Sequence, residues 1–290
     1  MKIGYPCINR SIGCTANSTF RLKSYSEDKL IEKIKNNLEC LNRILEYNVK
    51  NNILFFRISS DLVPFASHPI CKYNWSKHFQ KEFKEVGDYI DKNAIRISMH
   101  PDPFVIINSK DNAILERSIK ELDYHCSVLD AMGLNSTAKV QIHIGGVYRD
   151  KEKSIERFIE TYNRLSHEIR KRLTIENDDR SYGLKDCLAI HKKTEIPIVF
   201  DTLHHQCLNN GETIRNAILS AKKTWKKRDG KLMVDYSNQK TGVKKGMHNE
   251  NMDMKLFKKF IGETKGIDFD IMLEIKDKEK SALKAIKVIK

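Results

Sequence analysis

Histidine and acidic residues stand at the ends of six consecutive short apolar runs, and further histidines follow in two of the loops. The residues at the run ends are His100, His143, Glu176, Asp201, Asp235 and Glu274, and those in the loops are His204, His205 and His248. Imidazole and carboxylate ligands without thiolates suit manganese, zinc or iron. One tetrahedral ion cannot use so many ligands, so this set predicts two or three divalent ions.

Each of these residues also has a purely structural interpretation. His143 could be a core imidazole bonded to a backbone carbonyl, Glu176 could pair with a lysine, and Asp201 could cap the next helix. The metal interpretation is favoured by the number of such residues at successive run ends. Brought together, these groups would repel one another or lack partners unless a cation bound them.

Short β-rich runs alternate with longer amphipathic stretches along the whole chain. The β-like runs are Lys2–Tyr5, Ile53–Ser59, Ala94–Met99, Lys139–Ile144, Leu173–Glu176, Ile196–Asp201, Leu232–Tyr236 and Asp270–Ile275. The helix-like stretches are 27–49, 77–92, 111–132, 150–171, 183–194, 211–228, 250–264 and 277–290. Ser26, and Asn108-Ser109 before Lys110, are expected helix starts, and Gly133 is an expected helix end.

Eight such units within 290 residues predict a (β/α)8 TIM barrel that forms one domain over residues 1–290. A doubly wound open sheet is the alternative, but it usually carries a glycine-rich phosphate turn after its first strand. Here the first run leads into Pro6-Cys7-Ile8-Asn9. In a barrel the carboxyl ends of all strands meet at one mouth, which would bring the histidine and acidic residues together.

The composition limits the class of protein. Lysine and arginine number 52 against 38 acidic residues, and this net charge of +14 favours a polyanionic partner such as nucleic acid or a membrane surface. No stretch approaches the roughly 20 apolar residues of a membrane-spanning helix, and the start lacks the apolar centre of a signal peptide. The seven cysteines are scattered, which predicts free thiols in a reducing, intracellular compartment.

The sequence resembles the UV damage endonucleases, the UvsE/UVDE family, over nearly its whole length. The matching stretches keep the family order: Gly4-Tyr5, 37–45, 56–64, 96–101, 129–133, 143–148 with 150–152, 175–179, 199–201 with His204-His205, 223–225, 234–237 and 271–279. The resemblance implies a TIM-barrel, metal-dependent endonuclease. Such enzymes nick duplex DNA immediately 5′ to cyclobutane pyrimidine dimers and 6-4 photoproducts, and some also act at abasic sites.

The resemblance also implies roles for individual residues, with manganese as the expected metal and zinc, magnesium or cobalt as alternatives. One ion would take His100, His143 and Glu176, a second Glu176, Asp201, Asp235 and Glu274 with Glu176 bridging, and a third His204 and His248. His68 also matches a family position and is a candidate ligand or supporting residue. Glu176, Glu274, Asp201 and His143 are the expected catalytic residues.

Candidates for DNA contact are spread over the chain. The aromatic and amide candidates are Tyr5, Asn9, Phe104 and Tyr148, and the basic candidates are Arg57, Lys151, Lys222 and Lys223. Tyr5 could instead lie in the barrel floor, and Arg57 could pair with a barrel carboxylate. Two positions depart from the family: Asp235 is histidine in some relatives, and a glutamine followed by an aromatic residue reads Pro103-Phe104 here.

Four functions remain to be separated. The favoured one is the UV lesion endonuclease, acting as a monomer on UV-damaged double-stranded DNA. An abasic-site endonuclease resembling the endonuclease IV group shares the barrel and ligand types. A metal-dependent sugar isomerase or epimerase uses the same barrel, but the +14 charge counts against it. A non-enzymatic nucleic-acid-binding protein would not need the full set of candidate ligands.

Overall fold

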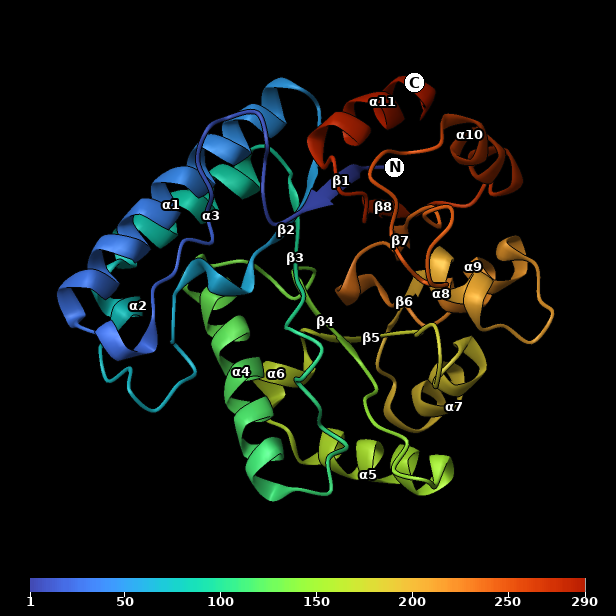
Figure 1. The fold of residues 1–290 in the computed structure, drawn as a ribbon, viewed down its shortest axis with the longest axis horizontal. Helices are drawn as coiled ribbons and strands as arrows, with labels where there is room; N and C mark the ends of the chain where they lie inside the picture. The colour runs from blue at the N-terminus through green and yellow to red at the C-terminus, as the bar shows by residue number, and fades with distance from the viewer. Residues whose placement is uncertain (290) are drawn as a thin grey trace.

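Eight short, buried runs form the parallel strands of a closed barrel, and the helices surround it (Figure 1). The structure is a computed structural model that describes residues 1–289. The strands are β1 (Ile3–Pro6), β2 (Phe55–Ile58), β3 (Arg96–Met99), β4 (Lys139–His143), β5 (Leu173–Glu176), β6 (Ile198–Asp201), β7 (Met233–Tyr236) and β8 (Asp270–Leu273). Neighbouring strands pair in chain order, and β1 closes the barrel against β8. The predicted TIM barrel is confirmed.

The helices follow the strands as expected, although the predicted stretches 77–92 and 150–171 are each divided and 211–228, 250–264 and 277–290 are shorter. The α-helices are α1 (Glu27–Lys50), α2 (Trp75–His78), α3 (Gln80–Lys92), α4 (Asn112–Ala131), α5 (Lys151–Arg164), α6 (His167–Arg170), α7 (Leu184–Thr194), α8 (Thr202–Cys207), α9 (Ile214–Lys222), α10 (Met254–Glu263) and α11 (Glu279–Ile289). Short 3-10 turns lie at Leu22–Ser24, Ser60–Leu62 and Lys227–Asp229. Between residues 1 and 289, no helix has the length and apolar character to span a membrane.

Side-chain caps set the helix starts. Ser26 accepts a hydrogen bond from the backbone N–H of Lys29, so the start predicted there is confirmed. The start of α4 was placed too early, because Asp111 is the residue whose side chain accepts from the backbone of Ala113 and Ile114. The end predicted at Gly133 is confirmed by its left-handed backbone, with φ of 71°.

The floor of the barrel, opposite the mouth, is closed by apolar and ionic contacts. Phe55, Val199, Met233 and Met272 form a buried cluster, and the ring of Trp225 packs against it. Arg96 spans the floor from β3 to an ion pair with Asp270 on β8, with an N–O distance of 3.0 Å. These contacts leave the opposite ends of the strands free to carry polar side chains.

One expectation about the cysteines is wrong. The structure joins Cys14, in the loop after β1, to Cys40 on α1 by a disulfide. The fold brings their Cα atoms to 6.0 Å although they are 26 residues apart, a separation within the range that a disulfide spans. Cys7, Cys71, Cys126, Cys187 and Cys207 are free thiols.

Candidate metal centre

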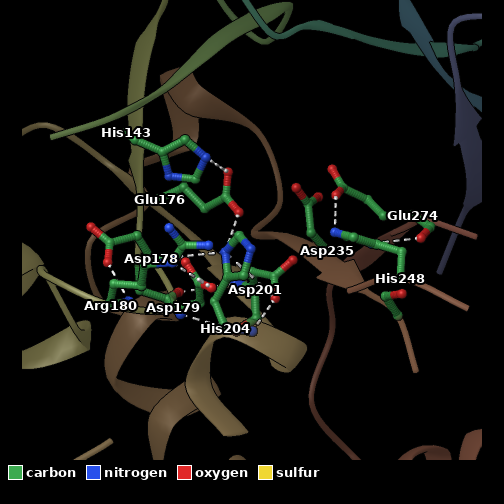
Figure 2. Close-up of polar contacts among 12 residues, drawn as sticks. His143, Glu176, Asp178, Asp179, Arg180, Asp201, His204, Asp235, His248 and Glu274 are labelled. Atoms are coloured by element: carbon green, nitrogen blue, oxygen red, sulfur yellow. Dashed lines mark hydrogen bonds and ion pairs between the residues drawn. The ribbon is translucent and has the colours of Figure 1, made fainter. Parts of the chain in front are cut away.

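The histidine and acidic residues at the strand ends converge at the barrel mouth (Figure 2). Three groups have ligand atoms within 4.8 Å of one another: His100, His143 and Glu176; Glu176, Asp201 and His204; and Asp201, Asp235 and Glu274. Most members come from β4 to β7 or from the residue just after β3 or β8, and His204 comes from α8, the short helix after β6. The predicted convergence is therefore present, and Glu176 and Asp201 each belong to two groups.

Glu176 lies between the imidazoles, with only 1% of its surface exposed. Its Oε2 is 3.3 Å from His100 Nε2 and 3.7 Å from His143 Nε2. Its Oε1 faces the other way and is 3.0 Å from His204 Nδ1. Burial raises the pKa of Glu176, but the surrounding imidazoles outweigh this effect and hold the pKa well below its usual range. One carboxylate thus presents its two oxygens to two different groups.

Two of the other three carboxylates, Asp235 and Glu274, share a single buried cation. Arg57 reaches across the barrel from β2, and its Nη2 lies 2.8 Å from Asp235 Oδ2, while its Nη1 contacts Glu274. Burial raises the pKa of Asp201 to about 7 and that of Asp235 to about 8. Burial acts in the same direction on Glu274, but Arg57 outweighs it and lowers the pKa of Glu274 to about 2. Burial thus disfavours the charged forms of Asp201 and Asp235, and a bound cation would favour them.

The histidines differ in their protonation. Burial lowers the pKa of His143, which favours the neutral imidazole that ligates metals. Burial also lowers the pKa of His204, but Asp201 and Glu176 outweigh it and raise the pKa to about 12. The structure places His204 with Glu176 and Asp201 rather than with His248, whose ring centroid is 6.3 Å from that of His204. His248 lies beside Glu274 instead, with its Nε2 3.7 Å from Glu274 Oε2.

Two buried polar atoms in this cluster indicate what it can bind. Among the described residues, Asp201 Oδ2 and His143 Nδ1 have no hydrogen-bond partner. A buried carboxylate oxygen and a buried imidazole nitrogen without partners are costly, and a divalent cation satisfies such atoms together. The donor set of oxygen and nitrogen atoms therefore fits divalent ions such as manganese or zinc.

Sequence reasoning missed Gln141, which lies in the middle of the cluster. Its Nε2 donates to Glu176 Oε2 at 2.5 Å and to Asp235 Oδ2 at 2.6 Å, and its Oε1 accepts from Arg57 at 3.0 Å. Gln141 is fully buried on β4, two residues before His143. Alternate residues of a strand share one face, so this spacing was the available signal.

Several predicted site residues lie elsewhere. His68 is exposed and outside the three groups, and its Nδ1 accepts from the backbone N–H of Ile70. Tyr5 is fully buried, and its hydroxyl donates to Asn48 and accepts from Asn9, which is 3% exposed. As the structure stands, Tyr5 and Asn9 satisfy each other inside the protein and do not present their polar atoms to DNA.

The basic residues expected to contact DNA lie in different surroundings. Arg57 is 3% exposed and pairs with the barrel carboxylates, which is the structural interpretation weighed for it. Lys222 and Lys223 are exposed, but Lys222 is the last residue of α9 and Lys223 follows it, just before the chain returns to the amino end of β7. They lie near Trp225 at the barrel floor, away from the mouth. Their exposure reflects a solvated helix end.

Three candidates remain in the mouth loops. Phe104 is 71% exposed in the loop between β3 and α4. Tyr148 is half-buried, with the Arg157 guanidinium 5.2 Å from its ring centroid. Lys151 begins α5 and pairs with Asp186 at 2.7 Å. Phe104 is the candidate with the most surface free for a partner.

Comparisons with known proteins agree with this geometry. A sequence-family model described as UV-endonuclease UvdE matches residues 1–290. The UV DNA damage endonuclease of Clostridium perfringens (strain 13 / Type A) is 41% identical over 292 residues, covering 100% of this chain and 71% of that protein. The crystal structure of SacUVDE superposes with a TM-score of 0.96 at 46% identity, covering 100% and 98% of the two chains.

A more distant likeness concerns the fold alone. Endonuclease IV from Thermus thermophilus has a TM-score of 0.57 at 15% identity, covering 86% of this chain and 92% of that one. At this identity the match reflects the shared barrel architecture.

Proposed function

Because the chain belongs to the UV-endonuclease UvdE family, it is a DNA repair endonuclease for UV damage, and we propose that it uses divalent metal ions to hydrolyse the phosphodiester immediately 5′ to the lesion. The lesions in question are cyclobutane pyrimidine dimers and 6-4 photoproducts in duplex DNA. The position of Glu176 carries this proposal. Its two oxygens face two separate groups of candidate ligands, as a carboxylate that bridges two ions must do.

The ligands would divide between two or three ions, most simply manganese. His100, His143 and Glu176 would hold one ion, and Glu176, Asp201, Asp235 and Glu274 a second. His204, which lies with Glu176 and Asp201, and His248, which lies beside Glu274, would complete the coordination or hold a third ion. When bound, such ions lower the pKa of a water and neutralise the charge on the phosphoryl group and the leaving oxygen.

The protein residues prepare this site before substrate arrives. Glu176, Glu274, Asp201 and His143 are the proposed catalytic residues. Arg57 keeps Glu274 ionised, and burial keeps His143 neutral, so each is in the protonation state that a ligand needs. Neighbouring side chains hold the carboxylates in orientation. Gln141 donates to Glu176 and Asp235, and Arg57 pairs with Asp235 and Glu274.

Lesion recognition is assigned to the mouth loops. A photoproduct weakens pairing and stacking, so its nucleotides are cheaper to unstack than normal ones. The exposed ring of Phe104 lies in the loop that follows His100 and can insert where the stack is weak. Tyr148 and Lys151 belong to the next mouth loop and the helix start after it, where contacts to the DNA strand are expected.

The test is nicking of supercoiled plasmid in three forms: untreated, UV-irradiated and depurinated. Each form is incubated with manganese and with a chelator. Nicking of the UV-irradiated form that requires manganese, with the untreated form intact, supports the proposal. Nicking of the depurinated form alone would instead indicate an abasic-site endonuclease, and no nicking with manganese, zinc, magnesium or cobalt would direct attention to sugar substrates.

The partner and setting follow from this activity. The substrate is UV-damaged double-stranded DNA, so we place the enzyme inside the cell with the DNA and not with membranes. Each chain carries a full set of candidate ligands from its own strands, so a monomer is sufficient. Analytical ultracentrifugation with and without DNA measures this state directly.

Gln141→Leu is expected to weaken metal binding by about 10- to 100-fold, the usual effect of losing a residue that orients ligands. The substitution removes the shared donor that orients the Glu176 and Asp235 carboxylates toward the ion. Calorimetric titration with manganese measures the change. Thr174→Val on β5 is the matched control, since it removes a buried hydroxyl that contacts only the Val140 carbonyl. Equal manganese affinity for both variants would contradict the role of Gln141.

A further inference from the structure

Two lysines of the turn after β8 line the same cavity as the candidate metal ligands. The cavity measures about 390 Å³ and is bordered by His100, His143 and Glu274 on one side and by Lys276 and Lys278 on the other. Cavities at the mouth of such a barrel are where substrates bind. The two lysines differ in what they already contact, and this difference suggests different roles.

Lys276 already has an acidic partner at the rim of the cavity. Its Nζ lies 2.9 Å from Glu250 Oε1, and the same carboxylate also pairs with Lys240 at 3.0 Å. This pair is half-exposed, so its replacement is expected to change little. The charge of Lys276 is therefore already partly balanced by a carboxylate.

Lys278 has no such partner. Across residues 1–289, no carboxylate oxygen lies within ion-pair distance of its ammonium group, although the side chain is half-buried in the cavity. Burial lowers the pKa of Lys278, while the nearby Cys7 and Glu274 act in the opposite direction. A cation taken partly out of water without an anion is unfavourable unless a ligand supplies one.

The backbone also holds Lys278 in an unusual conformation. Its φ is 54°, in the left-handed region that residues with a side chain seldom adopt, and its N–H donates to the Ile275 carbonyl at 3.1 Å. Such a conformation persists where the surrounding structure demands it, often at functional sites. Here the tight turn directs residue 278 into the cavity before α11 begins.

We propose that Lys278 binds a phosphodiester oxygen of the DNA strand that enters the metal centre. The proposal rests on the proposed function, since it names a contact to the same substrate. The phosphodiester supplies the anion that the lysine lacks, and the lysine holds the strand in register over the ligands. This contact reads no base, so damaged and undamaged strands are bound alike through it.

The consequence is a defined change in salt dependence. Each phosphate that a protein neutralises contributes about one unit to the slope of log affinity against log salt concentration. Lys278→Met is expected to reduce that slope by about one, and to raise KM for UV-irradiated DNA roughly tenfold with kcat changed less than about twofold. Lys276→Met should leave the slope and KM as they are in the unaltered protein.

The experiment compares the unaltered protein, Lys278→Met, Lys278→Arg and Lys276→Met. Fluorescence anisotropy with a UV-irradiated duplex is measured in chelator from about 50 mM to about 200 mM salt, and plasmid nicking is measured with manganese. Loss of one unit of slope in Lys278→Met, with recovery in Lys278→Arg, supports the proposal. The same slope for Lys278→Met and Lys276→Met overturns it. Thermal unfolding establishes that each variant is folded.

Two further arms complete the experiment. The first distinguishes a DNA phosphodiester from a free phosphate ion as the ligand of Lys278, and the second tests the lysine contact separately from the nicking activity. Inorganic phosphate is added as a competitor, because the cavity could take the free ion instead of the DNA strand. The result that would overturn the proposal in favour of a free-phosphate site has two parts. Competition by inorganic phosphate would depend on Lys278, and the slope of log DNA affinity against log salt concentration would be the same with and without Lys278. Failure of the unaltered protein to nick UV-irradiated plasmid would refute the proposed function, while the slope measured in chelator still tests Lys278.

Discussion

Glu176→Gln is expected to abolish metal-dependent nicking, with a loss of at least about 1,000-fold, or about 4 kcal/mol in the activation barrier. Glutamine keeps the size of the side chain but removes the charge that faces His100 and His143 on one side and His204 on the other. A neutral amide cannot bridge two cations through both terminal atoms, because its nitrogen is not an acceptor. The expected loss therefore falls on every ion that shares this residue.

The same variant has a readout that does not depend on activity. Ions that bind only the folded protein raise its unfolding temperature as their concentration rises. We expect manganese to stabilise the unaltered protein and to stabilise Glu176→Gln far less. Glu250→Gln is the control, since Glu250 is an exposed carboxylate at the rim that pairs with Lys240 and Lys276. If Glu176→Gln nicked irradiated plasmid within about fivefold of the Glu250→Gln rate, the assignment of Glu176 as the shared ligand would be wrong.

The barrel could be predicted because its strands are short, apolar and regularly spaced. The run Leu173–Glu176 has the same bounds in the sequence and in the structure. The stretch 77–92 was predicted as one helix, but it is divided at Phe79, whose backbone leaves the helical region. Phe79 is itself buried and apolar, so the hydrophobic spacing continues through the break and gives no sign of it.

The candidate ligands could be predicted because topology alone brings strand ends together. His100 and Glu274 are far apart in the chain, yet both lie at the mouth of the same cavity. The position of Lys222 and Lys223 away from the mouth follows from the same reasoning. The end of a helix in this fold lies opposite the strand ends, so α9 delivers these lysines to the floor.

The buried positions of Tyr5, Asn9 and Arg57 depend on contacts that no local sequence pattern encodes. The hydroxyl of Tyr5 is taken up by Asn48 on α1, which is 43 residues away in the chain. Asn9 then bonds to the same hydroxyl. Arg57 is drawn inward by Asp235 and Glu274, which belong to strands at the other end of the sequence. Each side chain has the chemistry to contact DNA, and the tertiary structure uses that chemistry internally.

Phe104→Ala is expected to reduce the preference for damaged over undamaged DNA. Its ring is 71% exposed, and it lies four residues after His100, so an inserted ring would reach the DNA beside the metal centre. Stacking of an aromatic side chain on a base is worth about 1–3 kcal/mol by alanine substitution, which corresponds to about 5- to 150-fold in affinity. The loss should fall on irradiated DNA, because only a weakened stack opens at low cost.

The measurement is the ratio of kcat/KM for irradiated and untreated plasmid, with Phe104→Tyr and Leu256→Ala as matched variants. Tyrosine keeps the stacking surface and should preserve the ratio. Leu256 is also an exposed apolar residue, at 48%, but it lies on α10 outside the mouth loops, so its removal should have no effect. The preceding residue, Pro103, has no polar side-chain group to share the insertion. An unchanged ratio in Phe104→Ala would therefore exclude this loop from discrimination and leave the metal centre to respond to the distorted backbone alone.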